Sequence, residues 1–148
     1  MQLADRIQGL LADTGLEVDR VDARTLHVAL PSQARGGIGV LIRCNERTAS
    51  LTAFIMRRPD RDTEAVQFRL LRRNLETPWW RFAVDDHGDV FAVAHADAGT
   101  LEGDGLDDLL GLLVSTVDEV YEPLVRTGFD IPEGISLSGP PRTDPPAV

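Results

Sequence analysis

The fold is decided by a central stretch, residues 69–125, which reads RLLRRNLETPWWRFAVDDHGDVFAVAHADAGTLEGDGLDDLLGLLVSTVDEVYEPLV. In its middle, Trp80, Phe82 and Val84 alternate with other residues, and the alternation resumes over 90–95. A period of two predicts half-buried strands. The intervening DDHGD contains the Asp and Gly residues that hairpin turns favour. We therefore predict an antiparallel hairpin here, preceded by the end of a helix.

A long amphipathic helix is predicted after the hairpin. Asp104 is its predicted N-cap, and Gly128 is its predicted C-terminal glycine. Its apolar positions recur at helical spacing: Leu106, Leu109, Leu110, Leu113, Val117, Val120, Tyr121 and Leu124. A helix of about 20 residues reaches about 30 Å, so it can cover a whole face of a small sheet.

The sequence upstream of residue 69 predicts two more helices and four strands. The predicted helices are 2–13 and 63–75, and the predicted strands are 16–21, 26–30, 40–44 and 48–56. In the second helix we expect Val66, Leu70 and Leu71 to face the core, with Asp60 or Asp62 as the cap. The order α-β-β-β-β-α-β-β-α predicts an α+β fold with a mostly antiparallel, twisted sheet flanked by helices. We expect the helices to cover one face, which leaves the other to a dimer partner or client.

Composition limits the classes of function. A net charge of −9 and a pI near 4.7 argue against general nucleic-acid binding, because such proteins need a basic surface. The sequence has no apolar run of membrane-spanning length and no signal peptide at its start, so we expect a cytoplasmic protein and no membrane partner. The single Cys44 predicts an inert, buried thiol.

Two segments divide the chain. Residues 1–128 contain every predicted helix and strand and are expected to form one domain. Residues 129–148 carry five of the nine prolines and almost no apolar residue after Leu137. We expect an extended or disordered, proline-rich tail there.

No catalytic or metal site is predicted. Asp85, Asp86, His87 and Asp89 have metal-binding chemistry, but a tight hairpin cannot aim all four side chains at one point, so a solvated turn is favoured. The three histidines, His27, His87 and His95, accompany no recognisable nucleophile motif. We expect His95 to be partly buried and hydrogen-bonded. We predict no catalytic residue, no metal and no cofactor.

An arginine cluster is the first candidate partner-binding feature. Arg69, Arg72 and Arg73 stand at i, i+3 and i+4 of the second helix, so they share one face. They can orient an acidic client or bind a phosphate. The alternative is a solvated face partly paired with Glu64 and Glu76.

Two adjacent tryptophans are the second candidate. Trp79 and Trp80 point to opposite sides in extended backbone. We expect one of them in the core and the other exposed as an interface anchor.

The central stretch resembles the YbjN domain family, and the order of elements extends this resemblance over about residues 1–127. The matching residues are Leu70, Leu71 and Asn74, the strand and turn from Arg81 to Val90, and Val117, Asp118, Tyr121 and Leu124. The resemblance implies a fold like that of the type III secretion chaperones, which are small, acidic and often dimeric and bind extended client segments without chemistry. YbjN-like proteins are described as regulators of sensory transduction or stress responses. The Trp79-Trp80 pair and the tail depart from the family pattern.

These observations predict a non-catalytic, cytoplasmic protein-binding module, chaperone-like or regulatory, that binds a client through an apolar surface and forms a homodimer. The alternative is a small-ligand sensor or enzyme with a pocket between the sheet and the helices. A pocket would require convergent polar side chains, whereas a binding module would expose an apolar patch.

Overall fold

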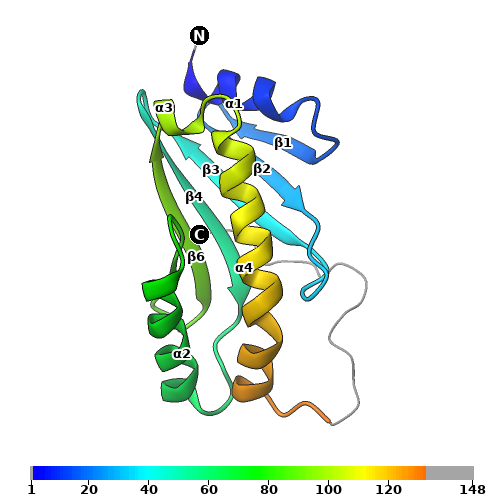
Figure 1. Ribbon diagram of the computed structural model, residues 1–148, viewed down its shortest axis with the longest axis vertical. Coiled ribbons are helices and arrows are strands. Elements are labelled where there is room, and N and C mark those ends of the chain that lie inside the picture. Colours follow the sequence, from blue (N-terminus) through cyan, green and yellow to red (C-terminus); the bar gives the residue numbers. More distant parts are fainter. Residues whose placement is uncertain (1, 133–148) are drawn as a thin grey trace.

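A six-stranded antiparallel sheet, with helices packed on one face, forms the protein (Figure 1). The computed structural model describes residues 2–132. The helices are α1 (Leu3–Leu11), α2 (Thr63–Glu76), α3 (Ala98–Leu101) and α4 (Gly105–Gly128). The strands are β1 (Glu17–Asp22), β2 (Thr25–Leu30), β3 (Ile38–Cys44), β4 (Thr48–Met56), β5 (Arg81–Val84) and β6 (Val90–Asp97). Their order in the sheet is β1-β2-β3-β4-β6-β5.

This architecture confirms the predicted α+β fold with an antiparallel sheet. Every predicted helix and strand is present in the predicted order. The short helix α3 was not predicted, because four residues are too few to show a helical period.

The core lies between the sheet and α4, which runs across the strands in Figure 1. Alternate strand residues such as Val28, Ile42 and Leu51 are fully buried beneath it. The predicted apolar stripe of α4 supplies the opposite wall, although Val120 is only partly buried. Burying such a side chain contributes about 1.5–3 kcal/mol, so this layer accounts for much of the stability.

Helix α2 lies at the edge of the sheet, beside β5 and α4. Val66 and Leu70 are buried as predicted, but the prediction for Leu71 was wrong, since its side chain is 67% exposed. A helix at a sheet edge has neighbours on one side only, so its buried stripe is narrower than the apolar pattern suggests.

Asn74 fastens α2 to β5. Its side-chain amide donates to the carbonyl of Phe82 (3.2 Å) and its oxygen accepts from the Phe82 amide (2.8 Å). Both Phe82 backbone groups lie on the outer side of β5, which is the edge of the sheet within residues 2–132. The contact therefore satisfies part of an otherwise open sheet edge.

The two predicted side-chain caps are absent. Asp104 and Asp62 occupy the N-cap positions of α4 and α2, but neither side chain accepts a capping hydrogen bond. An N-cap residue needs extended backbone, whereas Asp62 has φ 51° and Asp104 has ψ 0°. Asp97, whose backbone is extended, caps α3 instead and accepts from the Thr100 amide (2.7 Å).

The predicted tail lies largely outside the described residues, which end at Pro132. Phe129 and Ile131, at its start, pack against the core. The Arg57 guanidinium also lies 4.4 Å from the centre of the Phe129 ring. Residues just beyond the predicted boundary thus contact the folded domain.

Candidate partner-binding site

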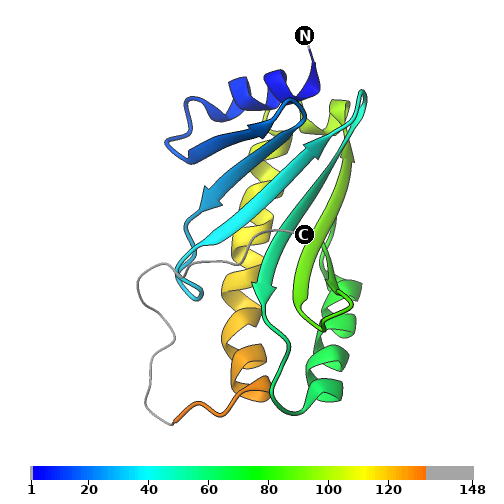
Figure 2. The ribbon, with the colours of Figure 1, turned by 180° about the vertical axis from the view of Figure 1, so that it is seen from behind.

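The face of the sheet opposite α4 carries no helix within residues 2–132 (Figure 2). The strand residues that alternate with the core residues point to this side. One row crosses the whole sheet through successive cross-strand pairs, and its members are Asp19, His27, Leu41, Thr52, Val93 and Arg81. We call this side the open face.

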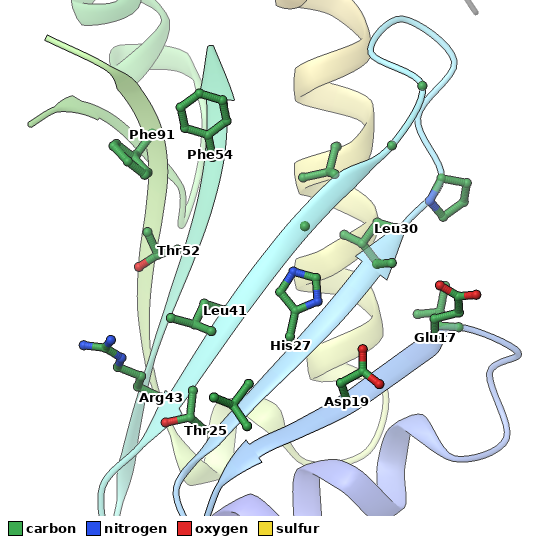
Figure 3. Close-up of a pocket in the computed structure, with 18 of the residues that line it drawn as sticks. Glu17, Asp19, Thr25, His27, Leu30, Leu41, Arg43, Thr52, Phe54 and Phe91 are labelled. Atoms are coloured by element: carbon green, nitrogen blue, oxygen red, sulfur yellow. The ribbon is translucent and has the colours of Figure 1, made fainter. Parts of the chain in front are cut away.

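A groove of about 1000 Å³ hollows the open face over β1 to β4 and β6. Leu41, Phe54 and Phe91 form an apolar part of its surface, and all three are partly buried. The rings of Phe54 and Phe91 meet edge to face with centroids 5.6 Å apart. In Figure 3 these rings lie at one side of the groove, and His27 and Leu41 lie between them and β1.

Arg35 is a buried residue that contacts the aromatic part of the groove. Its side chain is buried, and its Nε donates to the Ile55 carbonyl (2.9 Å). Its guanidinium lies 5.7 Å from the centre of the Phe54 ring and 5.9 Å from that of Tyr121. A cation over an aromatic face stabilises the ring position. This residue was not predicted from the sequence, because nothing distinguishes a single arginine in a glycine-rich loop.

The loop that carries Arg35 is tied to α4. The Asp118 carboxylate accepts from the Ser32 hydroxyl (2.6 Å) and from the Ala34 amide (3.2 Å). These bonds hold the β2–β3 loop at the end of the groove. Asp118 is one of the residues that carry the resemblance described above, and this contact gives it a structural role.

The charged groups of the groove are unevenly placed. Glu17, Asp19 and Asp22 line it from β1 and its end, whereas Arg43 lines it from β3. The Arg24 amide donates to the Asp22 carboxylate (2.8 Å), and this hydrogen bond, reinforced by one with Thr25, lowers the pKa of Asp22. The β1 side of the groove is therefore acidic.

One tryptophan lies in the core and the other is exposed, as predicted, but the expected extended backbone was wrong at Trp79. Trp80 is 1% exposed and donates from its indole nitrogen to the Leu109 carbonyl of α4 (2.9 Å). Its side chain is thus part of the core and presents no surface to a partner. Trp79 is 52% exposed, and its backbone is left-handed at φ 68°. Non-glycine residues rarely adopt this conformation, and strained positions often carry function.

The arginine cluster lines a second, smaller groove of about 600 Å³ between α2 and α4. Arg73 pairs with Glu119 of α4 (2.7 Å), and not with Glu64 or Glu76. The Arg72 guanidinium lies 5.9 Å from the centre of the Phe68 ring. Within residues 2–132, Arg69 and Arg72 have no carboxylate partner.

Helix α2 also exposes an apolar stripe toward solvent. Phe68, Leu71 and Leu75 are 61%, 67% and 88% exposed, and they follow one another at i, i+3 and i+7. We call these three residues the α2 stripe. Trp79 follows it in the loop after the helix. This stripe was not predicted from the sequence, because Leu71 was expected to face the core.

The turn between β5 and β6 is held by hydrogen bonds to two of its aspartates. The Asp85 carboxylate accepts from the amides of His87 (2.9 Å) and Asp89 (3.0 Å), and Asp89 accepts from the Arg58 amide (2.8 Å). Among the described residues, no group of His, Cys, Asp and Glu side chains is placed to hold a metal ion. His95 is exposed, so the expectation that it is partly buried was wrong.

Cys44 is buried, and burial raises the pKa of its thiol. A raised pKa keeps the thiol protonated and poorly nucleophilic at neutral pH. This confirms the predicted buried thiol.

Comparison with known families decides the family. A family model described as "Putative bacterial sensory transduction regulator", YbjN, matches residues 3–126. The chain belongs to the YbjN family. Uncharacterised proteins of Mycobacterium tuberculosis and Mycobacterium leprae are similar to this YbjN chain, at 30% and 28% identity over 104 residues. Those residues are 70% of this chain but only 57% and 56% of those proteins, so the chain spans little more than half of their length.

Solved structures show the same fold. A chain of the heterodimeric ExoU–SpcU complex from the type III secretion system of Pseudomonas aeruginosa is 24% identical, with a TM-score of 0.57, over 80% of this chain and 96% of that chain. A chain of the ExsC–ExsE complex is 16% identical, with a TM-score of 0.60, over 84% and 97%. The YbjN chain therefore has the fold seen in these two complexes. None of its described helices is long and apolar enough to cross a membrane.

Proposed function

We propose that this YbjN protein is a non-catalytic, chaperone-like module that binds a segment of a client protein on the open face of its sheet. The observation that carries this proposal is the apolar groove formed by Leu41, Phe54 and Phe91. The two solved structures with this fold are both complexes with a second protein, which supports a binding role.

The groove suits an extended segment better than a compact ligand. It runs over five strands, and its wall includes Gly36, Gly37 and Gly39, which have no side chains to narrow it. Extended peptides bury alternate side chains against such a surface. The client would bury its apolar side chains on this face. Because the face is already exposed to solvent, the domain would not have to unfold or open to bind.

We further propose that two copies associate through the α2 stripe. A twofold interface requires one patch to complement itself. In an antiparallel pair of α2 helices centred on Leu71, Phe68 of each copy meets Leu75 of the other. Trp79 lies at the end of this seam as an anchor, and Arg69 and Arg72 lie beside it. Trp79, Arg69 and Arg72, which were predicted to bind a partner, would thus contribute to self-association.

A β5-to-β5 pairing is a poorer route to the dimer. The Phe82 amide and carbonyl on the outer edge of β5 already bond to Asn74. A strand added there would have to displace both bonds. Association through the exposed surface of α2 displaces neither of these hydrogen bonds.

A small-ligand sensor is the second candidate, because a groove of about 1000 Å³ is large enough for one. The groove lies on the open face and not between sheet and helices. Its polar groups, chiefly Asp19, His27 and Arg43, are spread along it and do not converge on one point (Figure 3). This arrangement favours the protein client.

The test is a pull-down from lysate of the native organism with wild-type protein and with Leu41→Asp. A carboxylate at position 41 would face the groove, so the variant should retain its melting transition but lose a stoichiometric protein partner. Leu10→Asp, the same change at an exposed leucine of α1, is the matched control and should retain it. Equal capture by wild type and Leu41→Asp would contradict the proposed site.

A copurifying small molecule that Leu41→Asp loses, with no protein partner, would favour the ligand sensor instead. Native mass spectrometry of the purified protein distinguishes these outcomes. It also reports whether the protein is a dimer.

A further inference from the structure

The acidic wall of the open face indicates which client it accepts. Glu17 and Asp19 belong to β1 and stand two residues apart, so they point to the same side of the sheet. Both line the groove, and Figure 3 shows them at the side opposite Phe54 and Phe91.

These two carboxylates are unpaired in the described part of the chain. Within residues 2–132, no ion pair or hydrogen bond engages the side chain of Glu17 or Asp19. Arg20, the basic residue next to Asp19, points to the other side of β1 and bonds to Asp5 (3.1 Å) and Gln8 (2.8 Å) of α1. The arginine of β1 is thus bonded to α1, whereas Glu17 and Asp19 remain available in the groove.

The only cation lining this groove among the described residues is Arg43, and it comes from a different strand. Arg43 pairs across the sheet with Thr25 and Ser50, whereas Asp19 pairs with His27. The groove is therefore apolar toward β4 and β6, where Phe54 and Phe91 lie, and acidic along β1. The net charge of −9 adds a long-range attraction for a basic segment.

We propose that the client is an extended segment that places apolar side chains on Leu41, Phe54 and Phe91 and an arginine or lysine against Glu17 and Asp19. This inference rests on the proposed function and deepens it. The apolar contacts would supply most of the affinity, and the charges would set the direction in which the segment lies and reject acidic segments.

The test uses three labelled ten-residue peptides. Each alternates leucine and threonine over its last eight residues, and the first two residues are arginine, glutamine or glutamate. Fluorescence anisotropy measures affinity, and amide chemical-shift changes locate the peptide. We expect the arginine peptide to bind about tenfold more tightly than the glutamate peptide, with shifts in β1, β3, β4 and β6.

Variants assign this preference to the two carboxylates. Glu17→Gln with Asp19→Asn should weaken the arginine peptide about fivefold and leave the glutamine peptide unchanged. Asp107→Asn with Asp108→Asn makes the same change in net charge on exposed α4 residues and should have no such effect.

Equal affinity of the arginine and glutamate peptides would overturn the inference. So would an equal loss in the two double variants, since net charge alone would then explain the preference. No binding by any peptide would overturn it as well. The Leu41→Asp pull-down with the native client is a separate measurement, so the proposed function can survive the failure of the basic-segment inference.

Discussion

The same strands form both faces of the sheet, but helices cover one face, and within residues 2–132 no helix covers the other. On β3, Ile42 is fully buried beneath the helices, whereas its neighbour Leu41 lies on the open face and is partly exposed. One face specifies the fold, and the other is free to carry a function. A one-residue step along a strand therefore separates stability from binding.

The largest expected effect comes from a matched pair of truncations on β3. Ile42→Ala should lower the free energy of unfolding by about 2–5 kcal/mol, because it leaves a cavity in a closed core. Leu41→Ala should cost less than about 1 kcal/mol, since solvent already reaches that side chain. Urea denaturation of both variants measures the difference. Similar losses would show that the open face is covered in solution.

The next contrast concerns the edge of the sheet at β5. Asn74→Ala should cost about 1–3 kcal/mol, because it removes two hydrogen bonds from the Phe82 backbone. Asn45→Ala, at an exposed turn residue, is the control and should cost little. Thermal melts compare the two, and new aggregation in Asn74→Ala would further indicate an opened edge. A melt identical to that of the control would show that Asn74 does not protect β5.

Trp79 tests whether the α2 surface is an interface. Trp79→Gly and Trp79→Ala both remove the indole, but only glycine relaxes the positive φ. The glycine variant should be more stable than the alanine variant by about 1 kcal/mol, and both should shift a dimer toward monomer. Denaturation and analytical ultracentrifugation measure the two effects. An unchanged dissociation constant in both variants would remove Trp79 from the interface.

The smallest expected effect concerns two carboxylates on different faces of the molecule. Asp22 lies at the rim of the groove, and Asp97 caps α3. Hydrogen bonds from Arg24 and Thr25 lower the pKa of Asp22, and those from Thr100 lower the pKa of Asp97. A lowered folded-state pKa means that each stabilising contribution is complete above the unfolded value, near 4, and is lost as the pH falls through the folded value. Carboxyl NMR titration should place both midpoints below about 3.9. A midpoint at or above that value for either residue would contradict its hydrogen bonds.

The covered face was predictable from the sequence because its signal is local. Alternation of apolar residues gave the strands, and the helical period gave α4. The resemblance carried by Leu70, Asn74 and Asp118 predicted the fold. The structure supplied physical reasons for two of these residues, since Asn74 closes the β5 edge and Asp118 holds the β2–β3 loop.

The candidate site was less predictable, because it depends on neighbours distant in sequence. Leu71 has the spacing of a core residue, and only the edge position of α2 leaves it exposed. Arg35 reaches Phe54 and Tyr121 from a loop with no periodic signal. In the sequence, Glu17 and Asp19 are ordinary polar residues of a strand. Only the pairing with β2 and β3 shows that they line a groove.

Site-specific photo-crosslinking in the native organism can show which protein lies against each of the two surfaces. A photoreactive phenylalanine analogue would replace Phe91 on the open face or Phe68 in the α2 stripe, and mass spectrometry would identify each crosslinked protein. We expect position 91 to capture a different protein and position 68 to capture a second copy of this chain. Capture of the different protein at position 68, with none at position 91, would show that the client binds α2 and not the open face.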